Sequence, residues 1–285
     1  MARGAGPGFP AVVTKFHLRV RKAAPVMLQS FWCWPKSRTK EIINWVATTS
    51  PDYDSKTEIV AVSQTLPGHS EHTICSLFVT FADSVEAGQQ ALEQANKTRP
   101  EGCIIEEVNQ PTSLPDQYVN QAAANPLGHR YCADNAYVSD DADVGSVLEH
   151  SFTTLPHPKA FALYYAMGGA CTRRQMPDMA LSMQTDHYFA LYTVWEDEVD
   201  DERCQSWVRQ TMKGVERESQ GAYLGDSDFQ IRRTRFWSDE NAKRLMELRQ
   251  KWDPEGRICG YLDIDDASGV NGLANKHEWK ELVKP

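Results

Sequence analysis

The feature that most constrains the fold is the order of amphipathic segments, which predicts strand–helix–strand–strand–helix–strand in the first half and a similar order in the second. The first half has alternating or helical apolar patterns that predict strands at 11–20, 57–65, 73–81 and 103–108 and helices at 39–48 and 84–97. The second half predicts strands at 130–138, 160–167 and 186–195 and helices at 141–152, 200–217 and 239–252. A polar, proline-bearing stretch at 109–126 separates the halves. We therefore expect an α+β chain, with a large, mostly antiparallel sheet, helices on one face and split βαβ-like units.

Composition excludes several classes of protein. The 285 residues carry 30 Lys and Arg against 39 Asp and Glu, a formal net charge of −9, which disfavours nucleic acid as a partner. No apolar run is long enough for a membrane span, and the first twenty residues lack the apolar block of a signal peptide, so we expect a cytoplasmic protein without a membrane partner. Seven scattered cysteines without a CxxC pair predict reduced thiols rather than a disulfide scaffold or a zinc site.

The N-terminal region differs in charge from the rest of this acidic chain. Its first forty residues contain no acidic residue and eight basic ones: Arg3, Lys15, Arg19, Arg21, Lys22, Lys36, Arg38 and Lys40. A glycine turn, Gly4-Ala5-Gly6-Pro7-Gly8, lies almost at the first residue, although such turns normally join two structured elements. We interpret this turn as a boundary between two structural units.

Four segments resemble, in order, a known family. They are residues 3–18 (RGAGPGFPAVVTKFHL), 167–170 (MGGA), 190–197 (ALYTVWED) and the pieces of 236–257 that begin with FWS and end with WDPEGR. They are similar to the berberine bridge enzyme-like FAD-linked oxidoreductases, of the vanillyl-alcohol oxidase type. The resemblance covers the substrate half of that family.

The resemblance implies a division of the chain. Residues 1–20 correspond to the end of the flavin-domain segment, 21–260 to a substrate-type α+β domain with a berberine-like C-terminal segment, and 261–285 to a polar tail. The family's dinucleotide-binding loops belong to an N-terminal domain that we do not find here. We therefore expect no bound cofactor, and FAD only if a separate flavin-binding domain is supplied.

The resemblance also helps to select candidate residues for the functional site. Many family members place Glu or Gln on the strand before the Trp at the position that Ala190 occupies here, so the proton carriers must lie elsewhere. The catalytic candidates are His187, Tyr192 and Tyr188, because imidazoles and phenols can transfer protons. The candidates for substrate binding are Tyr165, Met167, Tyr223 and Trp237. Strand alternation predicts that about half of the tyrosines, with Tyr164 among those considered, point into the core instead. His69 and His72 are interpreted as a solvated loop, and no metal site is expected.

Three functions are compatible with these residues. The first is a cofactor-independent enzyme of secondary metabolism, an isomerase or cyclase type, which isomerises, cyclises or dehydrates a small aromatic or polyketide- or flavonoid-like substrate in an aromatic pocket. The second is a fragment or subunit of an FAD-linked oxidoreductase, joined to a partner chain through the basic N-terminal edge, which is also a candidate surface for self-association. The third is a non-catalytic metabolite-binding module.

Overall fold

The computed structural model describes residues 2–168, 177–229, 231–232, 234–255 and 257–258. The first half contains β1 (Val26–Pro35), α1 (Thr39–Thr49), β2 (Thr57–Thr65), β3 (His72–Ala82), α2 (Val85–Thr98) and β4 (Ile105–Pro111). After α3 (Leu114–Ala124), the second half contains β5 (Arg130–Val138), α4 (Val144–Thr153), β6 (Phe161–Ala166), β7 (His187–Trp195), α5 (Asp201–Val215) and β8 (Ser219–Gly221). The last helix is α6 (Asp239–Trp252). Within these ranges, none of the helices combines the length and the apolar character needed to span a bilayer.

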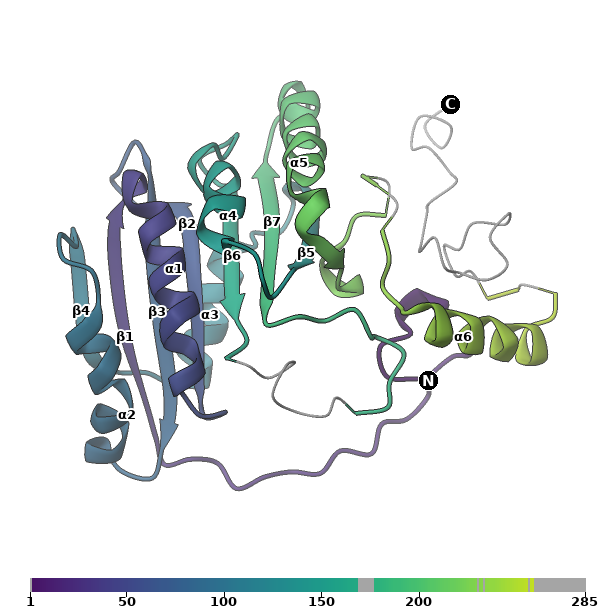
Figure 1. The fold of residues 1–285 in the computed structure, drawn as a ribbon, viewed down its shortest axis with the longest axis horizontal. Coiled ribbons are helices and arrows are strands. Elements are labelled where there is room, and N and C mark those ends of the chain that lie inside the picture. Colours follow the sequence, from purple (N-terminus) through teal and green to yellow (C-terminus); the bar gives the residue numbers. More distant parts are fainter. Residues whose placement is uncertain (1, 169–176, 230, 233, 256, 259–285) are drawn as a thin grey trace.

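All eight strands form one antiparallel sheet in the order β4-β1-β3-β2-β6-β7-β5-β8. Each half is a split βαβ unit with the same strand order, and the halves join where β2 pairs with β6. Helices α1, α2, α4 and α5 cover one face of the sheet (Figure 1). The predicted fold class is confirmed.

The main core lies between these helices and the sheet, and aromatic rings dominate it. Trp32 on β1 and Phe78 on β3 meet Trp45 of α1 at ring-centroid distances of 6.0 and 5.4 Å. Strand alternation places Trp32 and Phe78 on the same face because Ser30 pairs with Phe78 and Trp32 pairs with Ser76. The opposite face, which we call the open face, carries α3, whose Gln117 donates to Gln29 Oε1 on β1 at 2.8 Å (Figure 1).

One prediction about the first half is wrong. Residues 11–25 form no strand, and Phe16, Leu18 and Val20 are 76, 84 and 91% exposed. The first strand is β1, because its apolar residues suit a central position between β3 and β4, whereas the 11–20 alternation has no strand beside it to pair with. The stretch at 109–126, which separates the halves as predicted, also contains α3, which Ser113 caps by accepting a hydrogen bond from the Asp116 amide.

The glycine turn belongs to a second core with α6. Trp237 Nε1 donates to the Gly4 carbonyl at 3.0 Å, and Ala5, Leu181 and Leu245 are buried beside it. Gly4 has a φ of +77°, and a Cβ there would lie 2.4 Å from the Leu181 backbone nitrogen. Close packing therefore requires glycine at this position.

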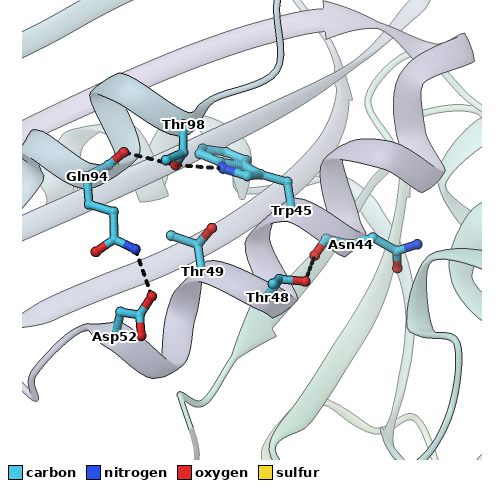
Figure 2. A pocket seen from close by; sticks show the side chains of 7 residues that line it. All are labelled: Asn44, Trp45, Thr48, Thr49, Asp52, Gln94 and Thr98. Atoms are coloured by element: carbon cyan, nitrogen blue, oxygen red, sulfur yellow. Dashed lines mark hydrogen bonds between the residues drawn. The ribbon is translucent and has the colours of Figure 1, made fainter.

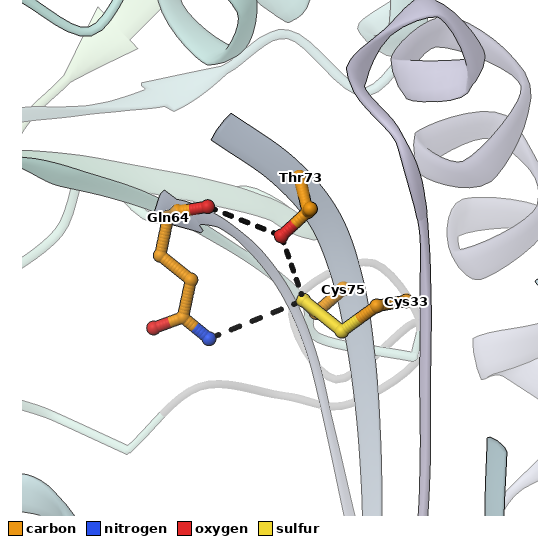
Figure 3. The surroundings of a disulfide bond; sticks show 4 residues. All are labelled: Cys33, Gln64, Thr73 and Cys75. Carbon is orange, nitrogen blue, oxygen red and sulfur yellow. Dashed lines mark hydrogen bonds between the residues drawn. A yellow bond between two sulfur atoms is a disulfide. The ribbon is translucent and has the colours of Figure 1, made fainter. Parts of the chain in front are cut away.

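The expectation of reduced thiols is also wrong for one pair. Cys33 on β1 lies opposite Cys75 on β3, with Cα atoms 4.0 Å apart, and the two form a disulfide (Figure 3). The pairing follows from strand register between residues 42 positions apart, which cysteine spacing does not reveal. Cys103, Cys132 and Cys204 are free.

Candidate functional site

Tyrosines from three strands gather on the open face of the second half. Strand pairing aligns Tyr137 on β5, Tyr188 on β7 and Tyr165 on β6 in one row. Their ring centroids lie 5.2 Å apart for Tyr137 and Tyr188 and 6.3 Å apart for Tyr165 and Tyr188. Tyr192, which follows Ala190 on the same face of β7, stacks on Phe161 with ring centroids 4.7 Å apart. Such rings offer a flat apolar surface with phenol groups at its edge.

A carboxylate completes this cluster. The short 3-10 turn Leu224–Asp226 follows β8 and brings Asp226 over the phenols. Tyr188 donates its hydroxyl hydrogen to Asp226 Oδ2, and Asp226 lies near enough to Tyr192 to act on that phenol through its charge. We call Tyr188, Tyr192 and Asp226 the phenol–carboxylate cluster.

Buried Asn135 on β5 holds the turn in place. Its side-chain nitrogen donates to the Tyr223 carbonyl at 2.8 Å and to Ser227 Oγ at 2.9 Å, and its oxygen accepts from the Tyr223 amide at 2.7 Å. Tyr223 thereby approaches Tyr188, with ring centroids 6.3 Å apart. The cluster is therefore fixed by the sheet on one side and by an anchored turn on the other.

The surroundings keep the phenols protonated. Burial raises the pKa of Tyr188 and of Tyr192, and the negative charge of Asp226 raises both further. Burial also raises the pKa of Tyr165 to about 12. At neutral pH these tyrosines are hydrogen-bond donors, and the proton-accepting group of the cluster is the carboxylate.

Asp226 was missed by sequence reasoning. Its neighbours, Gly225 and Ser227, form no motif, and its position depends on the pairing of β8 with β5 and on Asn135. The carboxylate that the family resemblance leads one to expect at Ala190 is thus supplied to the same face from a later turn.

His187 lies on the other face of β7 from Tyr188 and Tyr192. His187 Nδ1 and Tyr164 Oη share a hydrogen bond of 2.8 Å, and Tyr164 is fully buried in the main core. Alternation along β7 separates adjacent residues in this way. The structure therefore does not bring His187 together with the other two catalytic candidates.

The pKa of His187 leads to a stability prediction. Burial lowers it from the ordinary 6.5, although Asp140 and Asp186 oppose the shift. Just below pH 6.5 the unfolded chain binds a proton that the folded chain does not, so the free energy of unfolding should fall as the pH drops. His187→Gln should make this fall shallower in urea titrations at several pH values. Some decrease in the free energy of unfolding should remain in the variant, because burial also lowers the pKa of His72. An unchanged slope in the variant would contradict the assignment.

The remaining candidates for substrate binding are placed differently. Tyr165 and Tyr223 join the tyrosine cluster, and Met167, one position beyond β6, is 38% exposed. Trp237 is 1% exposed in the second core. Gly169 and Ala170 of the predicted paired-glycine segment lie outside the described residues. The structure thus groups four of the seven candidates: Tyr165, Tyr188, Tyr192 and Tyr223.

A surface hollow of about 460 Å³ lies between α1 and α2, on the helix-covered side of the sheet (Figure 2). Its polar groups bond to one another: Gln94 Nε2 donates to Asp52 Oδ2 at 2.7 Å, and Trp45 Nε1 donates to Thr98 Oγ1 at 3.3 Å. Figure 2 shows these groups engaged with each other across the hollow. Such internally bonded side chains offer little for catalysis, so the open face remains the better candidate site.

The described residues contain no cluster suited to a metal, and the glycine turn does not suit a dinucleotide. Within them, no group of three or more His, Cys, Asp or Glu is arranged to hold a metal ion. His72 uses both ring nitrogens, with Thr65 Oγ1 at 2.7 Å and the Leu155 carbonyl at 3.1 Å. The glycine turn does not form a phosphate cradle, since the Cβ directions of Gly4 and Gly8 are filled by Leu181 and Trp237. The glycine turn is therefore not a cradle for the FAD phosphates.

The chain is similar in sequence to known FAD-linked oxidoreductases. No family model matches the chain. It is 33% identical over 263 residues to the FAD-linked oxidoreductase ptmO of Penicillium ochrochloron, covering 92% of this chain and 58% of that protein. It is 31% identical over 264 residues to the FAD-linked oxidoreductase nodO of Hypoxylon pulicicidum, covering 93% and 59%. The chain thus spans less than two thirds of these relatives.

Solved structures share the fold at low sequence identity. BBE-like 1 of Physcomitrella patens, as the variant D396N, matches with a TM-score of 0.66 and 11% identity, over 91% of this chain and 56% of that one. The 6-hydroxy-D-nicotine oxidase of Arthrobacter nicotinovorans matches with a TM-score of 0.67 and 14% identity, over 89% and 58%.

Proposed function

Because this chain is a relative of the FAD-linked oxidoreductases of the berberine bridge enzyme-like type, we propose that it provides the substrate-binding part of such an enzyme. The observation that carries the proposal is the phenol–carboxylate cluster on the open face. Redox chemistry in this class belongs to the flavin. The described residues contribute substrate binding and proton transfer.

The cluster suits a substrate that must lose a proton. A substrate hydroxyl or N–H group within hydrogen-bond reach of Asp226 could transfer its proton to the carboxylate, a step typically worth about 10²- to 10⁴-fold in rate. Tyr188 holds the carboxylate in position through its hydrogen bond, and Tyr192 lies beside it. The Phe161–Tyr192 stack offers a surface for a planar aromatic substrate.

We assign the flavin to a part of the relatives' length that this chain does not match. The N-terminal segment is the proposed junction, in keeping with the domain division expected from the sequence. It combines exposed apolar residues such as Phe16 and Leu18 with basic ones such as Arg19 and Lys22. A partner chain, or a second copy of this one, would meet this edge.

A cofactor-independent isomerase or cyclase is the second candidate function. It is favoured by the presence of two phenol donors beside one carboxylate acceptor, which can remove and return a proton without an electron carrier. Isomerisation, cyclisation and dehydration of a polyketide-like substrate all need such transfers. A metabolite-binding module would use the same face without turnover.

A spectroscopic experiment separates these functions. After gel filtration with FAD, the chain alone should show no flavin absorption near about 450 nm. Co-production with the unmatched part of the Penicillium ochrochloron relative should give a complex that retains flavin. Stoichiometric flavin on the chain alone would contradict the proposed division of roles. Isomer formation by the colourless chain would favour the second function instead.

A further inference from the structure

We infer that the substrate of this site is an elongated, largely apolar molecule with a hydrogen-bond donor at one end, lying across the open face from β7 towards β1. The inference deepens the proposed function and rests on it. Its basis is the strand register, which extends the tyrosine site sideways over most of the sheet.

Two rows of side chains run from the site across the strands. One row joins Tyr188 to Tyr165, then to Val60, Leu77 and Phe31. The parallel row joins Ala190 to Leu163, then to Val62 and Cys75. We call these nine residues the apolar band. At about 4.8 Å between strands, the band from β7 to β1 is roughly 19 Å long.

The band has the burial and charge expected of a binding surface. Five of the nine residues have partly accessible side chains, namely Phe31, Val62, Leu77, Leu163 and Tyr165. The other four, Tyr188, Val60, Ala190 and Cys75, are buried. The band contains no charged residue, and the next position in its first row is Glu107 on the edge strand β4. Its other end lies at the phenol–carboxylate cluster.

These features specify the occupant. An apolar body would remove the band from water, whereas a charged body would lose hydration along it. A hydroxyl or N–H group at one end would meet the Asp226 carboxylate. Ala190 is itself buried, with Leu163, Tyr165 and Tyr192 packed around it, so the half-buried residues of the two rows would make the contact.

A series of 4-alkylphenols from ethyl to octyl tests the inference on the chain itself. The phenol provides the donor and the alkyl chain probes the band. Affinity measured by isothermal titration calorimetry should rise about two- to fourfold for each added methylene. Affinity that does not change with chain length in the unmodified protein would overturn the inference, and this measurement requires no variant.

Two variants locate the effect. Val62 lies two strands from Ala190, so Val62→Trp should abolish the gain in affinity from each added methylene in the longer phenols. Gln110→Trp adds the same side chain at an exposed position of β4 and should leave the whole series unchanged. An unaltered series in folded Val62→Trp, checked by circular dichroism, would overturn the inference.

Asp226→Asn separates this inference from the proposed function. The variant should weaken all members of the series by a similar factor and keep the gain per methylene. A gain that persists while the flavin experiment fails would support the band and contradict only the proposed function. If affinity does not depend on chain length in the unmodified protein while the complex retains flavin, the apolar band is contradicted and the proposed function stands.

Discussion

Asp226→Asn is expected to lower turnover by the flavin-loaded complex about 10²- to 10⁴-fold, because it replaces the proton acceptor of the site with an amide. The same change should lower the pKa of Tyr188 and Tyr192, since the charge of Asp226 raises both. Burial should still hold both above the ordinary value of 10.0. Steady-state kinetics measures the first effect, and ultraviolet titration of the phenols measures the second in the chain alone.

Glu58→Gln is the matched control for this change. Glu58 is an exposed carboxylate on β2, and its charge acts on Tyr165 rather than on Tyr188 or Tyr192. It should leave turnover nearly unchanged. Equal turnover in Asp226→Asn and Glu58→Gln would remove Asp226 from the proton-transfer step. An unchanged phenol titration in Asp226→Asn would contradict the close approach of Asp226 to Tyr188 and Tyr192.

The sequence predicted the second half of the fold well because its strands alternate in a simple way. The predicted strand at 130–138 coincides with β5, and that at 186–195 differs from β7 by one residue. Alternation also explains why Tyr164 lies in the core while Tyr165 faces the site. Periodicity captures such features because they depend on neighbours along one strand.

The features that the sequence did not reveal depend on contacts between distant segments. Asp226 reaches the phenols only through Asn135 and the pairing of β8 with β5, and Cys33 meets Cys75 only through register. The sequence analysis grouped His187 with Tyr188 as catalytic candidates, although alternation along β7 places these two neighbours on opposite faces of the sheet. Adjacent residues in a strand serve opposite faces, so proximity in sequence is a poor guide to a shared site.

Phe78→Ala is expected to lower the free energy of unfolding by about 3–5 kcal/mol, because it opens a cavity at the centre of the main core. Phe78 is fully buried, and its ring lies 5.9 Å from Trp32, 5.4 Å from Trp45 and 5.4 Å from Tyr53. Urea denaturation followed by tryptophan fluorescence measures the change.

Phe16→Ala removes the same side chain from the segment that the sequence predicted to be a strand. Phe16 is 76% exposed, so its removal should change the free energy of unfolding by no more than about 0.5 kcal/mol. A loss of several kcal/mol there would mean that residues 11–20 pack as a strand after all, and a small effect in Phe78→Ala would contradict the aromatic core. The pair of variants therefore compares a phenylalanine of the main core with one in the segment at 11–20.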